Sequence, residues 1–240
     1  MVAGKPWRVE LVAWLLLGVA ASILIGTVIV MGYNSAVLKP DQFENNIFIR
    51  FIGMFSINLL ILLQVNVFLR WQGITWREAF GFGEGKISRT ILLALFVTSL
   101  LVPLALGLQK ICWMVLESFN NQPVPQPAIQ HLQQTVTLVD RIYHAILSIV
   151  FAPIVEEVLF RGIFYPCIKF QGHPKLALWG TSLFFALIHG HLPTFLPLTL
   201  FALVLTLLYE STGNLLTPIL THSFFNALNF FLVISLPQSS

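Results

Sequence analysis

Six polar side chains interrupt the apolar stretches in the C-terminal half of this chain of 240 residues. They are Glu156, Glu157, Arg161, His189, His222 and Asn226. A charge near the centre of a bilayer costs about 2.5–3.5 kcal/mol, so residues of this kind pair, face a cavity or carry out chemistry. One carboxylate and two imidazoles can bind a divalent metal or polarise a water molecule, and an amide can stabilise an oxyanion. The residue types therefore indicate hydrolysis, with or without a metal.

The spacing of the acidic residues separates an ion pair from a free carboxylate. Glu157 and Arg161 are four residues apart, with the acid first, which is the favoured order for an ion pair on one helix face. Glu156 lies about 100° around the helix from Glu157, so it cannot share Arg161 with the same geometry. We therefore interpret Glu157 and Arg161 as supporting residues, and Glu156 as a catalytic or metal-binding residue.

The two histidines also belong to pairs with helical spacing. His222 and Asn226 share one face of the last apolar segment, and Phe185 and His189 share one face of an earlier segment, where Phe185 can wall a pocket. Each histidine alone would more often be an interhelical hydrogen-bonding residue. At a rise of about 1.5 Å per residue, however, both reach a depth similar to that of Glu156. The predicted catalytic residues are Glu156, His189, His222 and Asn226.

A metal site remains open at this stage. The predicted ligands are Glu156, His189 and His222, and zinc is the expected metal. The chain has no HExxH motif, so the helix of the familiar zinc proteases is absent. Cys112 and Cys167 have no metal-ligand spacing, and we interpret them as packing residues. A site with one divalent metal and a metal-free site are both compatible with the sequence.

The composition is that of an integral membrane protein. Hydrophobic residues make up 57% of the chain and charged residues 10%, with a mean hydropathy of +0.84, whereas soluble domains carry about 25% charged residues. We predict an all-α, polytopic helical bundle of about seven spans, with six to eight compatible. The third span can extend to Phe119 with a kink at Pro103, and the fifth and sixth form a tight hairpin. The predicted spans are 10–32, 47–69, 88–109, 142–168, 175–190, 192–210 and 214–236.

One composition shift divides the chain. Residues 120–141 form a Pro- and Gln-rich loop outside the membrane, between N-terminal spans of unassigned role in 1–119 and a helical core in 142–236 that carries the polar residues. Neither half has a soluble core of its own, so the prediction is one membrane domain overall. We find no internal repeat, which makes a transporter the weaker interpretation.

Basic residues predict the orientation. Lys and Arg favour cytoplasmic loops, and the excess on one side places the N-terminus in the cytoplasm, in a protein of the cell membrane; seven spans then place the C-terminus outside. Residues 11–31 exceed the length of a signal-peptide core, so we predict an uncleaved first span. Trp7, near its start, fits an aromatic belt. The net charge of +3 is explained by this topology, and no nucleic-acid partner is predicted. The two groups of basic residues are Lys5, Arg8, Arg70, Arg77, Lys86, Arg89, Lys169 and Lys175 on the cytoplasmic side, and Lys39, Lys110 and Arg141 on the other.

Three motifs resemble those of a known family. The segments 156–161 (EEVLFR), 185–189 (FALIH) and 222–226 (HSFFN) resemble the EExxxR, FxxxH and HxxxN motifs of the CPBP family, also called Abi. This family of membrane proteins includes the type II CAAX prenyl endopeptidases. All three motifs occur in order and in the expected spans, and the resemblance covers roughly residues 140 to 232. Each motif alone is weak, and together they are specific.

The resemblance implies an intramembrane endopeptidase. It implies that Glu156 and His189 position and activate the attacking water, and that His222 and Asn226 form the oxyanion hole, or that His222 joins a metal site. The implied partners are the lipid bilayer and a peptide or membrane-protein substrate, which includes prenylated CAAX proteins. The alternative is a non-proteolytic membrane partner, such as a bacteriocin-immunity or scaffold protein of the same family, in which the polar cluster only holds helices together.

Overall fold

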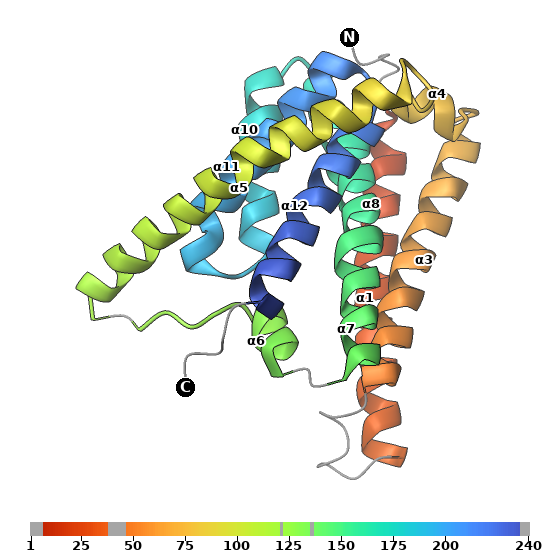
Figure 1. Ribbon diagram of the computed structural model, residues 1–240. Helices are drawn as coiled ribbons and strands as arrows, with labels where there is room; N and C mark the ends of the chain where they lie inside the picture. The colour runs from red at the N-terminus through yellow and green to blue at the C-terminus, as the bar shows by residue number, and fades with distance from the viewer. Residues whose placement is uncertain (1–6, 38–46, 121, 135–136, 236–240) are drawn as a thin grey trace.

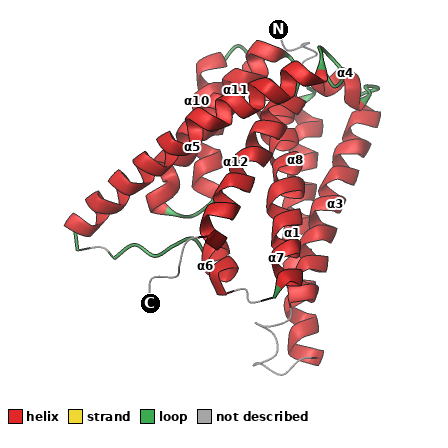
Figure 2. Cartoon of the chain, viewed as in Figure 1, coloured by secondary structure: helices red, strands yellow, loops and turns green. Residues whose placement is uncertain are grey.

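The computed structural model describes residues 7–37, 47–120, 122–134 and 137–235. Within these residues every regular element is a helix, as Figures 1 and 2 show, and the predicted all-α helical membrane bundle is confirmed. The helices are α1 (Val9–Val37), α3 (Ile47–Trp71), α4 (Trp76–Phe80), α5 (Ile87–Ser118), α6 (Pro127–Gln134), α7 (Leu138–Ala145), η1 (Ile146–Phe151), α8 (Ala152–Glu157), η2 (Val158–Phe164), α9 (Tyr165–Lys169), α10 (Pro174–Ile188), α11 (Leu192–Thr212) and α12 (Leu216–Ser235).

Each of the seven predicted spans corresponds to a helical segment. Five helices, α1, α3, α5, α11 and α12, are long and apolar enough to cross a membrane. The third span takes its longer form, because α5 continues to Ser118 with Pro103 inside it. The fifth is the shorter helix α10, which packs on α11 as the predicted hairpin. The total of seven crossings and the orientation stay predictions, and Lys5 and Lys39 lie outside the described residues.

The predicted loop at 120–141 is shorter than expected and is partly folded. The next helix begins at Leu138, because the Thr137 side chain accepts a hydrogen bond from the Asp140 N–H and caps it. Within the loop, α6 lies beside α12 (Figure 1). A ring nitrogen of His191 hydrogen-bonds to the Val124 carbonyl at 2.8 Å. The Pro- and Gln-rich segment is therefore attached to the turn between α10 and α11.

The fourth predicted span is one continuous helical run in which α and π turns alternate from Leu138 to Lys169. Each π segment ends two residues before a proline, η1 before Pro153 and η2 before Pro166. Proline has no N–H and its ring crowds the preceding turn, so a wider π turn allows the helix to continue past it. Carbonyl groups in those turns lose their helical partners as a result.

Side chains from elsewhere in the chain satisfy two of these carbonyls. The Trp7 indole N–H donates to the Gly162 carbonyl at 3.0 Å, four residues before Pro166. Asn226 Nδ2 donates to the Ser148 carbonyl at 2.8 Å, five residues before Pro153. Trp7 is only 7% exposed, so its interpretation as an aromatic-belt residue is wrong. It completes the hydrogen bonding of the central helix instead.

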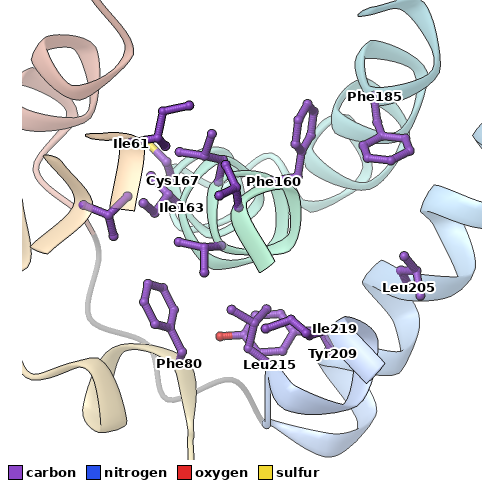
Figure 3. Packing of buried hydrophobic residues seen from close by; sticks show 14 of the residues in the cluster. Ile61, Phe80, Phe160, Ile163, Cys167, Phe185, Leu205, Tyr209, Leu215 and Ile219 are labelled. Carbon is purple, nitrogen blue, oxygen red and sulfur yellow. The ribbon is translucent and has the colours of Figure 1, made fainter. Parts of the chain in front are cut away.

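The carboxylate-bearing run lies at the centre of the core. Figure 3 shows Phe160 and Ile163 of this run surrounded by side chains that include Ile61 of α3, Phe80 of α4 and Leu215 next to α12. The Leu215 N–H donates to the Phe80 carbonyl at 2.9 Å, which ties α4 to the turn before α12. Helices from both parts of the chain therefore hold the central helix in place.

We expect Gly162→Ala to lower the thermal stability of the protein. A β-carbon at this position would lie 2.6 Å from a ring carbon of Phe80, which is fully buried. Such overpacking costs about 1–3 kcal/mol, which thermal unfolding followed by tryptophan fluorescence would detect. Gly107→Ala in α5 is the matched control, because a β-carbon there meets no atom within 4 Å. Equal effects of the two substitutions would contradict the packing argument.

Candidate active site

Glu157 is the centre of a buried hydrogen-bond network. Its side chain is 0% exposed, and its Oε1 accepts a 2.8 Å hydrogen bond from Arg161 Nη1. The same oxygen accepts a 2.8 Å hydrogen bond from Nδ1 of His222 on α12. The other guanidinium nitrogen, Nη2, donates to the Ala202 carbonyl on α11 at 3.1 Å. The ion pair expected from the helical spacing is present, and it also joins the central helix to α11 and α12.

The contact with Glu157 determines which nitrogen of His222 faces Glu156. An ionised carboxylate can only accept, so Nδ1 of His222 carries the proton in this bond. The opposite nitrogen, Nε2, lies 3.9 Å from Oε2 of Glu156, which is too long for a hydrogen bond. The Glu156 side chain is 28% exposed, yet its Oε2 atom is buried and has no hydrogen-bond partner. Glu156 Oε2 therefore faces an imidazole nitrogen at a separation that no direct hydrogen bond spans.

The contact of His222 differs from the one predicted from the sequence. Helical spacing predicts that Glu157 pairs with Arg161 alone and that the histidines gather around Glu156. Among the described residues, the His222 ring forms its hydrogen bond with Glu157. The helical-spacing rule considers one helix at a time, whereas a carboxylate has several lone-pair positions. Glu157 accepts through Oε1 alone, from Arg161 on its own helix and from His222 on α12, and its buried Oε2 has no hydrogen-bond partner.

Asn226 has a structural partner within the site. Its Nδ2 donates to the Ser148 carbonyl in η1. Pro153 cannot donate to this carbonyl, because proline has no N–H. One of the two amide hydrogens is thus used in holding α12 against the central helix. Ser148 was not predicted as a site residue. Pro153 was the signal that could have indicated it, because a proline inside a span leaves a carbonyl in need of a donor.

His189 sits at the C-terminal end of α10, close to Phe185. Its Nδ1 hydrogen-bonds to the Phe185 carbonyl at 2.7 Å, and since a carbonyl only accepts, Nδ1 carries the proton and Nε2 is left as an acceptor. Within the part of the chain that is described, no hydrogen bond or ion pair links His189 to Glu156 or His222. The ring of Phe185 lies between the two histidines, 4.8 Å from the His189 ring and 6.1 Å from the His222 ring.

Aromatic rings form the walls of the site. Phe185 is fully buried, and the Arg161 guanidinium carbon lies 4.8 Å from its ring centroid; its role as a pocket wall stays a prediction. Phe201 of α11 meets the His222 ring edge to face, with the centroids 4.9 Å apart. Apolar walls lower the local dielectric and strengthen the interactions among the charged groups between them. The network of Glu157, Arg161 and His222 is therefore shielded from water.

The predicted metal ligands do not form a three-ligand site in this arrangement. Among the described residues, no group of three His, Cys, Asp or Glu side chains is placed to hold a metal ion. Glu156 Oε2 and His222 Nε2 face each other, but the Nδ1 atoms of both histidines already have protein partners. We therefore derive no chemical step through a metal, and zinc binding by Glu156, His189 and His222 stays a prediction.

A comparison with known families identifies the segment that contains this site. Residues 138–228 match the family model described as Type II CAAX prenyl endopeptidase Rce1-like. The matched segment begins at α7 and includes every predicted site residue. Comparison with curated proteins gives no match, and comparison with solved structures gives none either.

Proposed function

We propose that this chain, a member of the CAAX protease (CPBP) family, is an intramembrane endopeptidase that hydrolyses a peptide bond with a water activated by Glu156. Family membership indicates CAAX intramembrane protease activity and membrane-embedded protein substrates. The apolar helices agree with an integral membrane protein. The identity of the catalytic residues and the chemistry at Glu156 are the parts that we propose.

The position of Glu156 Oε2 opposite His222 Nε2 carries the proposal. Both Glu156 and Glu157 have a buried Oε2 without a hydrogen bond, but Glu157 is bonded through Oε1 to Arg161 and His222. Glu156, in contrast, forms no hydrogen bond to the described residues, and its Oε2 stands 3.9 Å from His222 Nε2. One water can bridge two polar groups at such a separation. In the proposed step, Glu156 takes a proton from this water as the water oxygen attacks the peptide carbonyl carbon. The proton then passes to the leaving nitrogen as the C–N bond breaks.

Glu157 and Arg161 act in this mechanism as positioning residues for His222. The bond from Nδ1 to Glu157 turns Nε2 toward Glu156, and Arg161 holds the same carboxylate oxygen in place. A neutral His222 can then accept a hydrogen bond from the water through Nε2. An oxyanion role of His222 would need a proton on Nε2 as well as on Nδ1, and it stays a prediction. His189 as a second group that orients the water stays a prediction.

The role of Asn226 can be separated from its structural bond. Asn226→Ala removes the donor to the Ser148 carbonyl, and we expect it to lower the stability by about 1 kcal/mol. Pro153→Ala supplies a backbone N–H to the same turn, so the loss should be smaller in that background. Thermal unfolding of the wild type, both single variants and the double variant measures this coupling. Activity still missing from a stable double variant would support an oxyanion role, whereas recovered activity would assign Asn226 to structure alone.

A non-proteolytic membrane partner is the second candidate function. The hydrogen bonds of His222 to Glu157 and of Asn226 to Ser148 favour it, because both are what a cluster that only joins helices would contain. It gives no account of Glu156, a second carboxylate that forms no hydrogen bond to the described residues and faces His222 Nε2. We therefore prefer the endopeptidase.

Cleavage assays test the proposed function. Purified full-length protein in liposomes is incubated with peptides that end in a CAAX sequence, with and without a prenyl group on the cysteine, and mass spectrometry detects shortened products. In parallel, membrane proteins are compared between cells with the wild type and cells with Glu156→Gln. We expect shortened peptides or at least one membrane protein that accumulates uncleaved. If the protein is folded and neither result is obtained, the non-proteolytic partner is favoured.

Metal analysis tests the predicted zinc site. Purified wild-type protein and His189→Ala are compared for bound zinc per chain. If Glu156, His189 and His222 bind zinc, the wild type should carry about one zinc ion and the variant much less, because a three-ligand site loses one ligand. Equal metal content in both proteins would remove His189 from the ligand set.

A further inference from the structure

A polar cavity lies on a face of α12 other than the one that carries His222. It has a volume of about 370 Å³ and is formed between the start of α5 and the turn that joins α11 to α12. Thr217 in its wall and His222 are five residues apart on α12, which turns them about 140° away from each other. The cavity is therefore separate from the candidate active site. Its lining includes Glu84, Lys86, Arg89, Thr90, Thr212 and Thr217.

The positive charges of this cavity are not neutralised within the described residues. Lys86 and Arg89 are exposed and form no ion pair or side-chain hydrogen bond there, and Lys86 occupies the N-cap position of α5 without capping it. The N-terminal end of a helix carries a partial positive charge, so two cations and no acid in the first turn repel it. The carboxylate of Glu84 offsets one of these two positive charges. The cavity keeps an excess of positive charge that an anion would relieve.

One threonine in the wall is almost fully buried as a residue and forms no side-chain hydrogen bond within the described residues. Thr217 lines the cavity and is only 1% exposed, and its hydroxyl has no hydrogen bond to another described residue. Buried polar groups are nearly always hydrogen-bonded. Asn214 in the same wall is satisfied, since it bonds to the Glu84 carbonyl and to the Leu216 N–H. A ligand with hydrogen-bond acceptors would satisfy Thr217.

We propose that this cavity binds the phosphate group of a phospholipid headgroup. Lys86, Arg89 and Thr217 supply charge and hydrogen bonds to the phosphate, as basic clusters beside membrane helices do. The location favours a lipid over a soluble anion. The cavity lies where the candidate span α5 begins, at the end of the bundle where α3 ends (Figure 1). Ile87 and Leu92 of α5 are 58% and 66% exposed, so acyl chains can lie against them.

The test uses full-length protein in detergent and a short-chain phosphatidylglycerol kept below its micelle concentration. Binding is measured as the rise in unfolding temperature during a titration, and native mass spectrometry counts the bound lipid. We expect K86Q/R89Q to bind about thirtyfold more weakly, because each basic residue contributes about 1 kcal/mol. The matched control R70Q/K175Q removes two exposed charges outside the cavity and should bind as the wild type does. Thr217→Val, which keeps the shape, should weaken binding.

Each further outcome decides the proposal. Equal losses in K86Q/R89Q and R70Q/K175Q would reduce the effect to general attraction and overturn it. Inorganic phosphate is titrated in parallel, and binding as tight as that of the lipid would overturn the lipid assignment in favour of a soluble phosphate. If K86Q/R89Q does not fold, Thr217→Val carries the test, and unchanged binding in that variant would overturn the proposal.

Discussion

Glu156→Gln should abolish peptide-bond cleavage while the protein stays as stable as the wild type. Gln has the same shape but cannot take a proton from water, and general base catalysis contributes about 10²–10⁴-fold to a rate. Stability should not fall, because Glu156 makes no hydrogen bond to the described residues and its Oε2 has no partner. Removing its charge next to Glu157 also relieves a repulsion between like charges. The measurement is a cleavage rate beside an unfolding temperature on the same purified sample.

Two comparisons make this result specific. Glu10→Gln changes a carboxylate with a side chain 76% exposed, so both activity and stability should remain those of the wild type. Glu157→Gln changes the neighbouring carboxylate, and it should lower both, since Glu157 is bonded to Arg161 and His222. A wild-type cleavage rate in Glu156→Gln would show that Glu156 is not the base. The proposed mechanism would then fail, although the family assignment would stand.

The sequence predicted the fold well because a membrane restricts the choices. Apolar runs of sufficient length become helices in a bilayer, since each backbone group must be hydrogen-bonded within its own segment. The extent of α5 through Pro103 followed from run length. The start of the fourth helix at Leu138 did not, because Thr137 and Asp140 make a polar cap that hydropathy alone assigns to the loop.

The site was predictable in its residue types but only partly in its contacts. Helical spacing gave the bond between Glu157 and Arg161 correctly. It could not assign His222 to Glu157, because that contact depends on how α12 packs against the central helix. The bond from Trp7 to Gly162 joins residues 155 positions apart. No local pattern predicts such a contact, although Pro166 indicates that the Gly162 carbonyl needs a donor.

Arg161→Met should be the most destabilising single substitution in the site. It leaves the carboxylate of Glu157, 0% exposed, without its cation, and breaking a buried ion pair from one side costs about 3–5 kcal/mol. Lys169→Met is the matched control. Lys169 is paired with Glu210, but both side chains are about a quarter exposed, and pairs of that kind contribute about 0–1 kcal/mol. Unfolding temperatures in one detergent compare the two variants.

The double variant E157L/R161M separates stability from positioning. Replacing both members of a buried pair by apolar residues is often neutral, so the double variant should regain most of the stability that Arg161→Met loses. His222 Nδ1 then has no acceptor at Glu157, and Nε2 is no longer held toward Glu156. We therefore expect cleavage to stay low in a protein that is stable again. Recovery of both properties together would mean that Glu157 and Arg161 only hold the helices in place, and it would remove the orientation of His222 from the mechanism.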